Sequence, residues 1–263
     1  SRPIVSKKEY ITGAYSIQDT YGATVHEGDL EIKGRGNATW QYPKKPYHIK
    51  LADGAKLLGM PKGKHWVLLA NHVDKTMIRN ELTFELSRRL SMAYTPRSVF
   101  IELYLNGKYR GVYQLTEHVR IDKDRVNIPE LKISDTSEDV ISGGYLIEAD
   151  KRRGEDFCFD SEKTDMVFCL KNPETLLETG WELQQAYIVN YIRQTDNAIF
   201  SDQFKDPATG YAAYLDVDTT ILFYLINELF YNPDGDLRYS TFLYKQRGDK
   251  LYFGPMWDFD IAI

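Results

Sequence analysis

Apolar and polar residues alternate with a period of two over much of the first half of the chain, which is the pattern of half-buried β-strands. Four segments show this alternation or a run of β-forming residues: 9–18, 30–33, 47–51 and 66–70. Asp53-Gly54 is typical of a turn and predicts the end of the third strand. The N-terminal part is therefore predicted to be mostly β.

The clearest hairpin signal is Asn106-Gly107, which separates the strand-like residues 98–105 from 108–115. Asn-Gly favours a two-residue type I′ turn, because both positions need a positive φ. A helix is predicted before this hairpin, over residues 76–92, with Asp74 as a candidate N-cap. Apolar residues recur in it at helical spacing: Ile78, Leu82, Leu86 and Leu90.

The C-terminal part mixes strands with longer helices. It holds predicted strands at 143–148 and 166–171, predicted helices at 176–200 and 216–231, and a closing hairpin of 241–244 with 251–253. The second of these helices is strongly apolar, which predicts that it is buried. The order indicates an α+β protein with two lobes around a cleft, a β-rich N-terminal lobe (about 1–120) and a more helical C-terminal lobe (about 121–263).

Composition places the chain among globular proteins with a real core. It has 263 residues, of which 43% are hydrophobic and 27% charged. A net charge of -5 and the lack of a long basic stretch argue against a nucleic-acid partner. No apolar run reaches the length of a transmembrane helix. No leader is visible, and loss of a signal peptide would place the protein outside the cell or in the cell envelope.

Two cysteines, Cys158 and Cys169, flank a polar turn. A hairpin would place the two sulfur atoms opposite each other and allow a disulfide, and two buried free thiols are the equal alternative. Neither cysteine sits in a close pair of metal ligands, so a zinc site is not expected.

The first candidate for chemistry is the glycine-bearing segment 34–40, followed by Lys50 on a predicted strand. Such a turn lets the backbone approach a phosphate, and a strand lysine could pair with it. An ordinary turn with a surface lysine is the simpler alternative. Alternation places Lys50 on the face opposite Ile49.

Three acidic residues could support that lysine or a nucleotide. Glu81 and Glu85 lie one turn apart on the predicted helix, and either could pair with Lys50 as the helix glutamate of kinases does. Glu117 ends a strand near the lobe border, where an adenine could hydrogen-bond to the backbone. From spacing alone, an exposed residue at a strand end is the favoured interpretation of Glu117.

The most informative feature is the acidic tail. Asp234 and Asp236 follow the apolar helix, and Asp258 and Asp260 follow the closing hairpin within an apolar stretch. Carboxylate oxygens suit Mg²⁺ or Mn²⁺, and a metal would offset the cost of burying the second pair. Turn formation is the alternative for the first pair. The chain stops at Ile263, directly after the second turn, which suggests that the natural protein continues.

Several segments together resemble the spore coat protein H (CotH) kinase family of bacteria. The matching blocks run in order over most of the chain: Arg35-Gly-Asn-Ala-Thr-Trp40, Lys44-Lys-Pro-Tyr-His-Ile-Lys50-Leu, Leu69 to Asn80, Gly111 to Glu117, Gly144 to Glu148, and the ending from Asn232 to Asp260. The resemblance implies an atypical protein kinase with a kinase-like two-lobe fold, which uses ATP and Mg²⁺ (or Mn²⁺) to phosphorylate Ser or Thr of a protein.

Roles implied by the resemblance follow residue by residue. Asp234 would be the catalytic aspartate, Asp258 a metal ligand with Asp260 as the other candidate, and Lys50 a phosphate-binding residue. The nucleotide would further involve Arg35, Asn37, Glu81 or Glu85, and Glu117.

Two departures from the family pattern bear on activity. Ala38 replaces a serine of the first block, and Ser240 stands where many members have the asparagine that binds a second metal. A hydroxyl is a weaker metal ligand than an amide carbonyl. The alternative function is therefore a catalytically silent surface or adhesion module. A hydrolase using the acidic cluster on phosphate or glycan is a third hypothesis. Lys50 argues against a glycosidase, which does not need that lysine.

Overall fold

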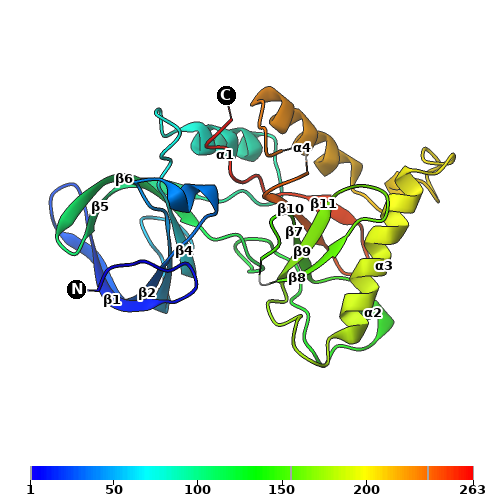
Figure 1. Ribbon diagram of the computed structural model, residues 1–263, viewed down its shortest axis with the longest axis horizontal. Helices are drawn as coiled ribbons and strands as arrows, with labels where there is room; N and C mark the ends of the chain where they lie inside the picture. The colour runs from blue at the N-terminus through cyan, green and yellow to red at the C-terminus, as the bar shows by residue number, and fades with distance from the viewer. Residues whose placement is uncertain (1, 155, 236, 263) are drawn as a thin grey trace. The chain divides into compact units, whose positions relative to one another are not determined.

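The structure, a computed structural model, describes residues 2–154, 156–235 and 237–262. The chain forms two compact units (Figure 1). The first comprises residues 2–78 and 96–118, and the second comprises 79–95 and 119–262.

The first unit is built on a six-stranded antiparallel sheet with the strand order β1-β2-β3-β4-β6-β5. Its strands are β1 (Ile11–Gln18), β2 (Thr24–Gly34), β3 (Tyr47–Ala55), β4 (Gly63–Leu69), β5 (Ser98–Leu105) and β6 (Lys108–Glu117), with a short 3₁₀ helix η1 (Ala38–Gln41) after β2. Alternate residues of β3 are buried, so Ile49 joins the core while Lys50 lies on the opposite, half-exposed face. Trp66, Leu68, Tyr113 and Leu115 complete that core from the neighbouring strands.

Two turn predictions in this unit had different outcomes. The β5–β6 hairpin is confirmed, and both Asn106 (φ 53°) and Gly107 (φ 73°) have the positive φ that a type I′ turn requires. The turn predicted at Asp53-Gly54 is wrong. Strand β3 continues through these residues to Ala55, because an irregularity in its pairing with β4 absorbs them.

The second unit has a five-stranded antiparallel sheet with the order β11-β10-β7-β9-β8, and helices lie along its outside (Figure 1). The strands are β7 (Tyr145–Ala149), β8 (Phe157–Asp160), β9 (Val167–Asn172), β10 (Thr241–Lys245) and β11 (Leu251–Phe253). The helices are α1 (Arg79–Arg89), α2 (Glu138–Ile141), α3 (Glu182–Ile199) and α4 (Val217–Leu229), with a 3₁₀ turn η2 (Tyr211–Ala213). Apolar residues of α3, α4 and the sheet form one core.

Helices α1 and α4 bury other residues than their sequence patterns predict. Helix α4 was predicted to be buried, but it buries only Phe223, Ile226 and Asn227, so the prediction is wrong for the rest of the helix. Helix α1 buries polar side chains and leaves Leu82 about half exposed. The exposed apolar residues of the two helices and their flanks are Ile78, Leu82, Leu90, Ile221, Tyr224, Leu225 and Leu229.

The cysteines form a disulfide across the β8–β9 hairpin, where Cys158 is directly opposite Cys169. The predicted hairpin thus decided between the two alternatives for these residues. The protein is a strand-rich α+β fold with two antiparallel sheets and its α-helices in the second unit. Within the residues that the structure describes, no helix has both the length and the apolar character to cross a bilayer.

Candidate functional site

The closing segment after β11 carries Asp258 and is held in place by helix α1. The backbone N–H of Phe259 donates to Asn80 Oδ1 at 2.8 Å, and Arg79 Nη1 donates to the carbonyl of Asp260 at 3.4 Å. The Trp257 ring stacks on Phe84 of the same helix. Asp258 is therefore a half-buried carboxylate between two buried aromatic residues, and its position is fixed by its neighbours.

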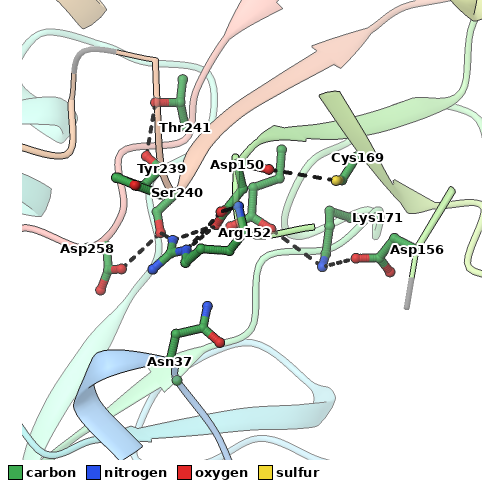
Figure 2. Close-up of polar contacts among 12 residues, drawn as sticks. Asn37, Asp150, Arg152, Asp156, Cys169, Lys171, Tyr239, Ser240, Thr241 and Asp258 are labelled. Carbon is green, nitrogen blue, oxygen red and sulfur yellow. Dashed lines mark hydrogen bonds and ion pairs between the residues drawn. The ribbon is translucent and has the colours of Figure 1, made fainter. Parts of the chain in front are cut away.

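Asp258 begins a chain of side-chain hydrogen bonds that runs across the end of the second sheet (Figure 2). Ser240 Oγ donates to Asp258 Oδ2 at 2.9 Å, and Arg152 Nη2 donates to Ser240 Oγ at 2.9 Å. The Arg152 guanidinium also pairs with both oxygens of Asp150, with Nε 2.8 Å from Oδ1 and 3.0 Å from Oδ2. An arginine–carboxylate pair with several bonds is geometrically specific, so these bonds define the direction of the guanidinium.

Backbone conformation supports the same arrangement. Ser240 (φ 50°) and Asp258 (φ 66°) both lie in the left-handed region, which costs free energy for residues other than glycine. Such conformations persist where the surrounding structure determines them and are frequent at functional sites. Here the two left-handed residues are hydrogen-bonded to each other, which makes this part of the second unit the candidate functional site.

A second ion-pair group lies beside the first. Lys171 on β9 contacts Asp156 at 2.8 Å and Glu148 of β7 at 3.4 Å. Burial raises the pKa of Glu148 above its ordinary value, although Lys171 acts against that shift. For Lys171, burial lowers the pKa, but the two carboxylates outweigh it and the net shift is upward. The lysine is therefore held charged next to the Asp150–Arg152 pair.

Asp234 lies in a loop that the end of α4 fixes locally. Its backbone N–H donates to Asn232 Oδ1 at 3.3 Å, and Asn232 Nδ2 donates to Asn227 Oδ1 at 3.1 Å. Glycine is required at 235, because a Cβ there would lie 1.9 Å from Asn227 Oδ1. The half-buried Asp234 is thus held by side chains that the sequence alone did not single out. Asp236 lies outside the described residues.

Lys50, in the first unit, forms an ion pair with Glu31 of the adjacent strand β2 at 2.8 Å. On helix α1, Glu81 contacts Arg88 at 2.7 Å, and Glu85 contacts Arg88 at 3.1 Å and Arg89 at 2.7 Å. The ion pair of Lys50 is thus with Glu31, and those of Glu81 and Glu85 are with arginines of α1. Pairing of Lys50 with Glu81 or Glu85 stays a prediction. A cavity of about 490 Å³ on the first sheet is lined by Lys50, Glu31 and seven other residues.

The glycines of segment 34–40 have a packing explanation. A Cβ on Gly34 would lie 2.4 Å from the Trp40 ring, and one on Gly36 would lie 1.9 Å from Thr39 Oγ1. Asn37 accepts a hydrogen bond from Lys7, and the backbone N–H of Arg35 donates to the carbonyl of Pro46. The segment is therefore folded against itself, and nucleotide contacts of Arg35 and Asn37 stay a prediction.

The exposed strand-end interpretation of Glu117 is wrong. Its side chain is fully buried and accepts hydrogen bonds from the backbone N–H of Arg97 at 3.0 Å and from Arg97 Nη1 at 2.9 Å. The hairpin places the start of β5 beside the end of β6, which local spacing does not reveal.

Sequence reasoning missed the other side chains of the second-unit site. Glu148 lies in β7, and Asp150 and Arg152 lie in the run of charged residues 150–153 that directly follows this strand. That run of charges after a predicted strand was a usable signal. Asn80 carried no such signal, because its partner lies 179 residues away.

Comparison with known proteins identifies the family of this chain. A family model described as CotH kinase protein matches residues 32–263. The chain belongs to the CotH kinase family, and a kinase family implies ATP and a divalent metal in general terms. A search of curated proteins found no match.

The residues present fit a metal that arrives with a nucleotide. Across the described ranges, no three His, Cys, Asp or Glu side chains are grouped so as to hold a metal by themselves. Mg²⁺ is commonly held by one or two carboxylates together with substrate phosphates and water, so a protein cage is not required. Asp258 could supply such a carboxylate, since its Oδ1 accepts no hydrogen bond from any residue that the structure describes.

Proposed function

We propose that this protein is an atypical kinase that transfers the γ-phosphate of ATP to Ser or Thr of a protein in a metal-dependent reaction. The observation that carries the proposal is the chain Asp258–Ser240–Arg152–Asp150 in a member of the CotH kinase family. It places a carboxylate with an available oxygen beside a fixed guanidinium. Phosphoryl transfer needs both, because metal and positive side chains must neutralise the phosphate oxygens.

In the proposed reaction, the substrate hydroxyl oxygen attacks the γ-phosphorus while the bond from that phosphorus to the β–γ bridging oxygen breaks. The products are the phosphorylated protein and ADP. Asp234 is the proposed acceptor of the hydroxyl proton, and Asp258 the proposed metal ligand, with Asp260 and Ser240 as further candidates. The metal, when bound, withdraws negative charge from the phosphate oxygens.

We also propose that residues 1–263 form one domain with a kinase-like fold of two lobes. Lys50, with Glu81 or Glu85, is proposed to support the phosphates, while Arg35, Asn37 and the backbone at Glu117 are proposed to contact the nucleotide.

A thermal unfolding experiment tests the proposal directly. A ligand that binds only the native state raises the unfolding temperature by mass action, with about 2.7 kcal/mol of stabilisation at 100 times Kd. The protein is heated with Mg-ATP, with Mg²⁺ alone and with Mg-GTP. A rise specific to Mg-ATP is expected. No rise with any nucleotide would reject the kinase proposal.

One observation favours a catalytically silent module as the second candidate. Ser240 donates its hydroxyl hydrogen to Asp258 and accepts from Arg152, so the residue at the family's second-metal position is engaged within the protein. Binding of Mg-ATP without phosphate transfer to any protein substrate, and without slow ATP hydrolysis, would support this candidate.

A further inference from the structure

Arg152 is held more firmly than an ordinary surface arginine. Its backbone N–H donates to Asp150 Oδ1 at 2.8 Å, and its guanidinium pairs with both oxygens of the same carboxylate. Nη2 reaches Ser240, and the guanidinium carbon lies 4.7 Å from the centroid of the Tyr239 ring. The side chain therefore loses little further entropy when a ligand binds.

One edge of this anchored cation is still available. Nε and Nη2 make all the hydrogen bonds, whereas Nη1 donates to none of the residues within the described parts of the chain. The side chain is 32% exposed. Figure 2 shows the guanidinium between Asp150 and Ser240, with Asp258 on the far side of Ser240. Two N–H groups of fixed direction suit the oxygens of a phosphate.

The charges of the cluster limit how many metal ions it can take. Arg152 forms its ion pair with Asp150, whereas Asp258 feels the guanidinium charge only at longer range, across Ser240. A single divalent ion can bind there with phosphate and water. A second divalent ion bound to Ser240 Oγ would lie next to the Arg152 guanidinium, which hydrogen-bonds to the same oxygen. Two positive groups this close repel each other strongly.

We propose that Arg152 takes the place of a second metal ion: the site binds one divalent cation, at Asp258, and Arg152 Nη1 binds a phosphate oxygen of the same nucleotide. This inference rests on the proposed function. It also gives a reason for serine at 240, since a small hydroxyl can accept from the arginine and donate to the aspartate simultaneously.

Counting Mn²⁺ tests the inference without measuring activity. The full chain is titrated with Mn²⁺ in the presence of a non-hydrolysable ATP analogue, and bound Mn²⁺ is followed by electron paramagnetic resonance. We expect one Mn²⁺ per bound nucleotide. Two Mn²⁺ per nucleotide would overturn the inference and leave the kinase proposal standing. No binding of the analogue would overturn the kinase proposal, and this inference with it.

Variants separate a phosphate contact from a structural role. Arg152→Ala should weaken binding of the analogue at least tenfold. Arg152→Lys should recover only part of that loss, because an ammonium lacks the planar fork. The matched control is Arg153→Ala, which removes the neighbouring arginine that pairs with Asp160 instead. Its affinity for the analogue should stay within twofold of wild type.

Arg152→Ala leaves the carboxylate of Asp150 buried without its partner, which is destabilising. The double variant Asp150→Asn/Arg152→Gln removes both charges and retains side chains that can hydrogen-bond. It should fold, as judged by circular dichroism, and should also bind the analogue at least tenfold more weakly. Wild-type affinity in this folded variant would overturn the phosphate-binding role of Arg152.

Discussion

At the scale of single residues, Asp258 and Asp234 carry the proposed chemistry with different supports. Asp258 is fixed through Ser240, and Asp234 through its loop on α4. Asp234→Ala should lower the rate of phosphate transfer by about 100- to 10,000-fold, the range for removal of a general base, with nucleotide affinity retained.

Asp258→Ala should lower both the rate of phosphate transfer and the affinity for Mn²⁺. Transfer from radiolabelled ATP and Mn²⁺ titration measure the two effects. Equal transfer by wild type and Asp258→Ala would reject its metal role.

Lys50 allows a test of the first-unit assignment. Its ion pair with Glu31 is about one-third exposed, so Lys50→Met should change the free energy of unfolding by only about 0–1 kcal/mol. If Lys50 binds phosphate, calorimetric titration with Mg-ATP will show weaker binding. Lys44 and Lys45 are unsuitable controls, because both donate to backbone carbonyls. Exposed Lys56 is the better control. Unchanged affinity in Lys50→Met makes Lys50 a surface charge.

Lys245 gives a prediction about pH. The ammonium is buried, donates to the carbonyls of Ser142, Gln246 and Asp249, and burial lowers its pKa to about 8, with the Asp249 carboxylate acting in the opposite direction. Between pH 8 and the ordinary value of 10.5 the unfolded chain binds more protons, so stability should rise with pH. Urea unfolding at pH 7.5, 8.5 and 9.5 should show this gain, on the order of 1 kcal/mol. Lys245→Met should remove that dependence, and a dependence that persists in the variant belongs to another group.

At the scale of elements, helix α1 holds the segment around Asp258 through a buried polar side chain, Asn80. Asn80→Ala leaves the buried N–H of Phe259 without its acceptor, which should cost about 1–3 kcal/mol of stability and weaken Mn²⁺ binding through Asp258. Leu82→Ala on the exposed side of the same helix should change stability by no more than about 0.5 kcal/mol. Urea unfolding compares the two variants. A larger loss for Leu82→Ala than for Asn80→Ala would contradict this orientation of α1.

At the scale of the whole molecule, the two-lobe proposal can be tested by hydrogen exchange. A nucleotide bound between kinase-like lobes should slow exchange in both units, at residues 34–40 and 47–51 of the first and at 239–242 and 256–260 of the second. Mass spectrometry with and without the Mg-bound ATP analogue measures this. Protection confined to the second unit would mean that Lys50, Arg35 and Asn37 do not contact the nucleotide.

The disulfide bears on where the whole protein works. Cys158–Cys169 is a structural cross-link within the second unit, and such bonds persist in oxidising compartments. We therefore propose an extracellular or cell-envelope location.

The sequence by itself determined the features that depend on near neighbours. Alternation predicted the main strands, Asn106-Gly107 predicted the turn of the β5–β6 hairpin, and ordered motifs identified the family. These signals are local, because turn type and side-chain face follow from a few adjacent residues.

Tertiary structure decided which polar residues meet. Arg152 contacts Ser240 from 88 positions away, and Asn80 holds Phe259 from 179 positions away. Glu117 is buried because β5 begins beside it, and α4 keeps an exposed apolar side because the core needs only one of its faces. Burial and ion pairing at long range depend on how sheets and helices pack, and no local pattern of residues encodes that packing.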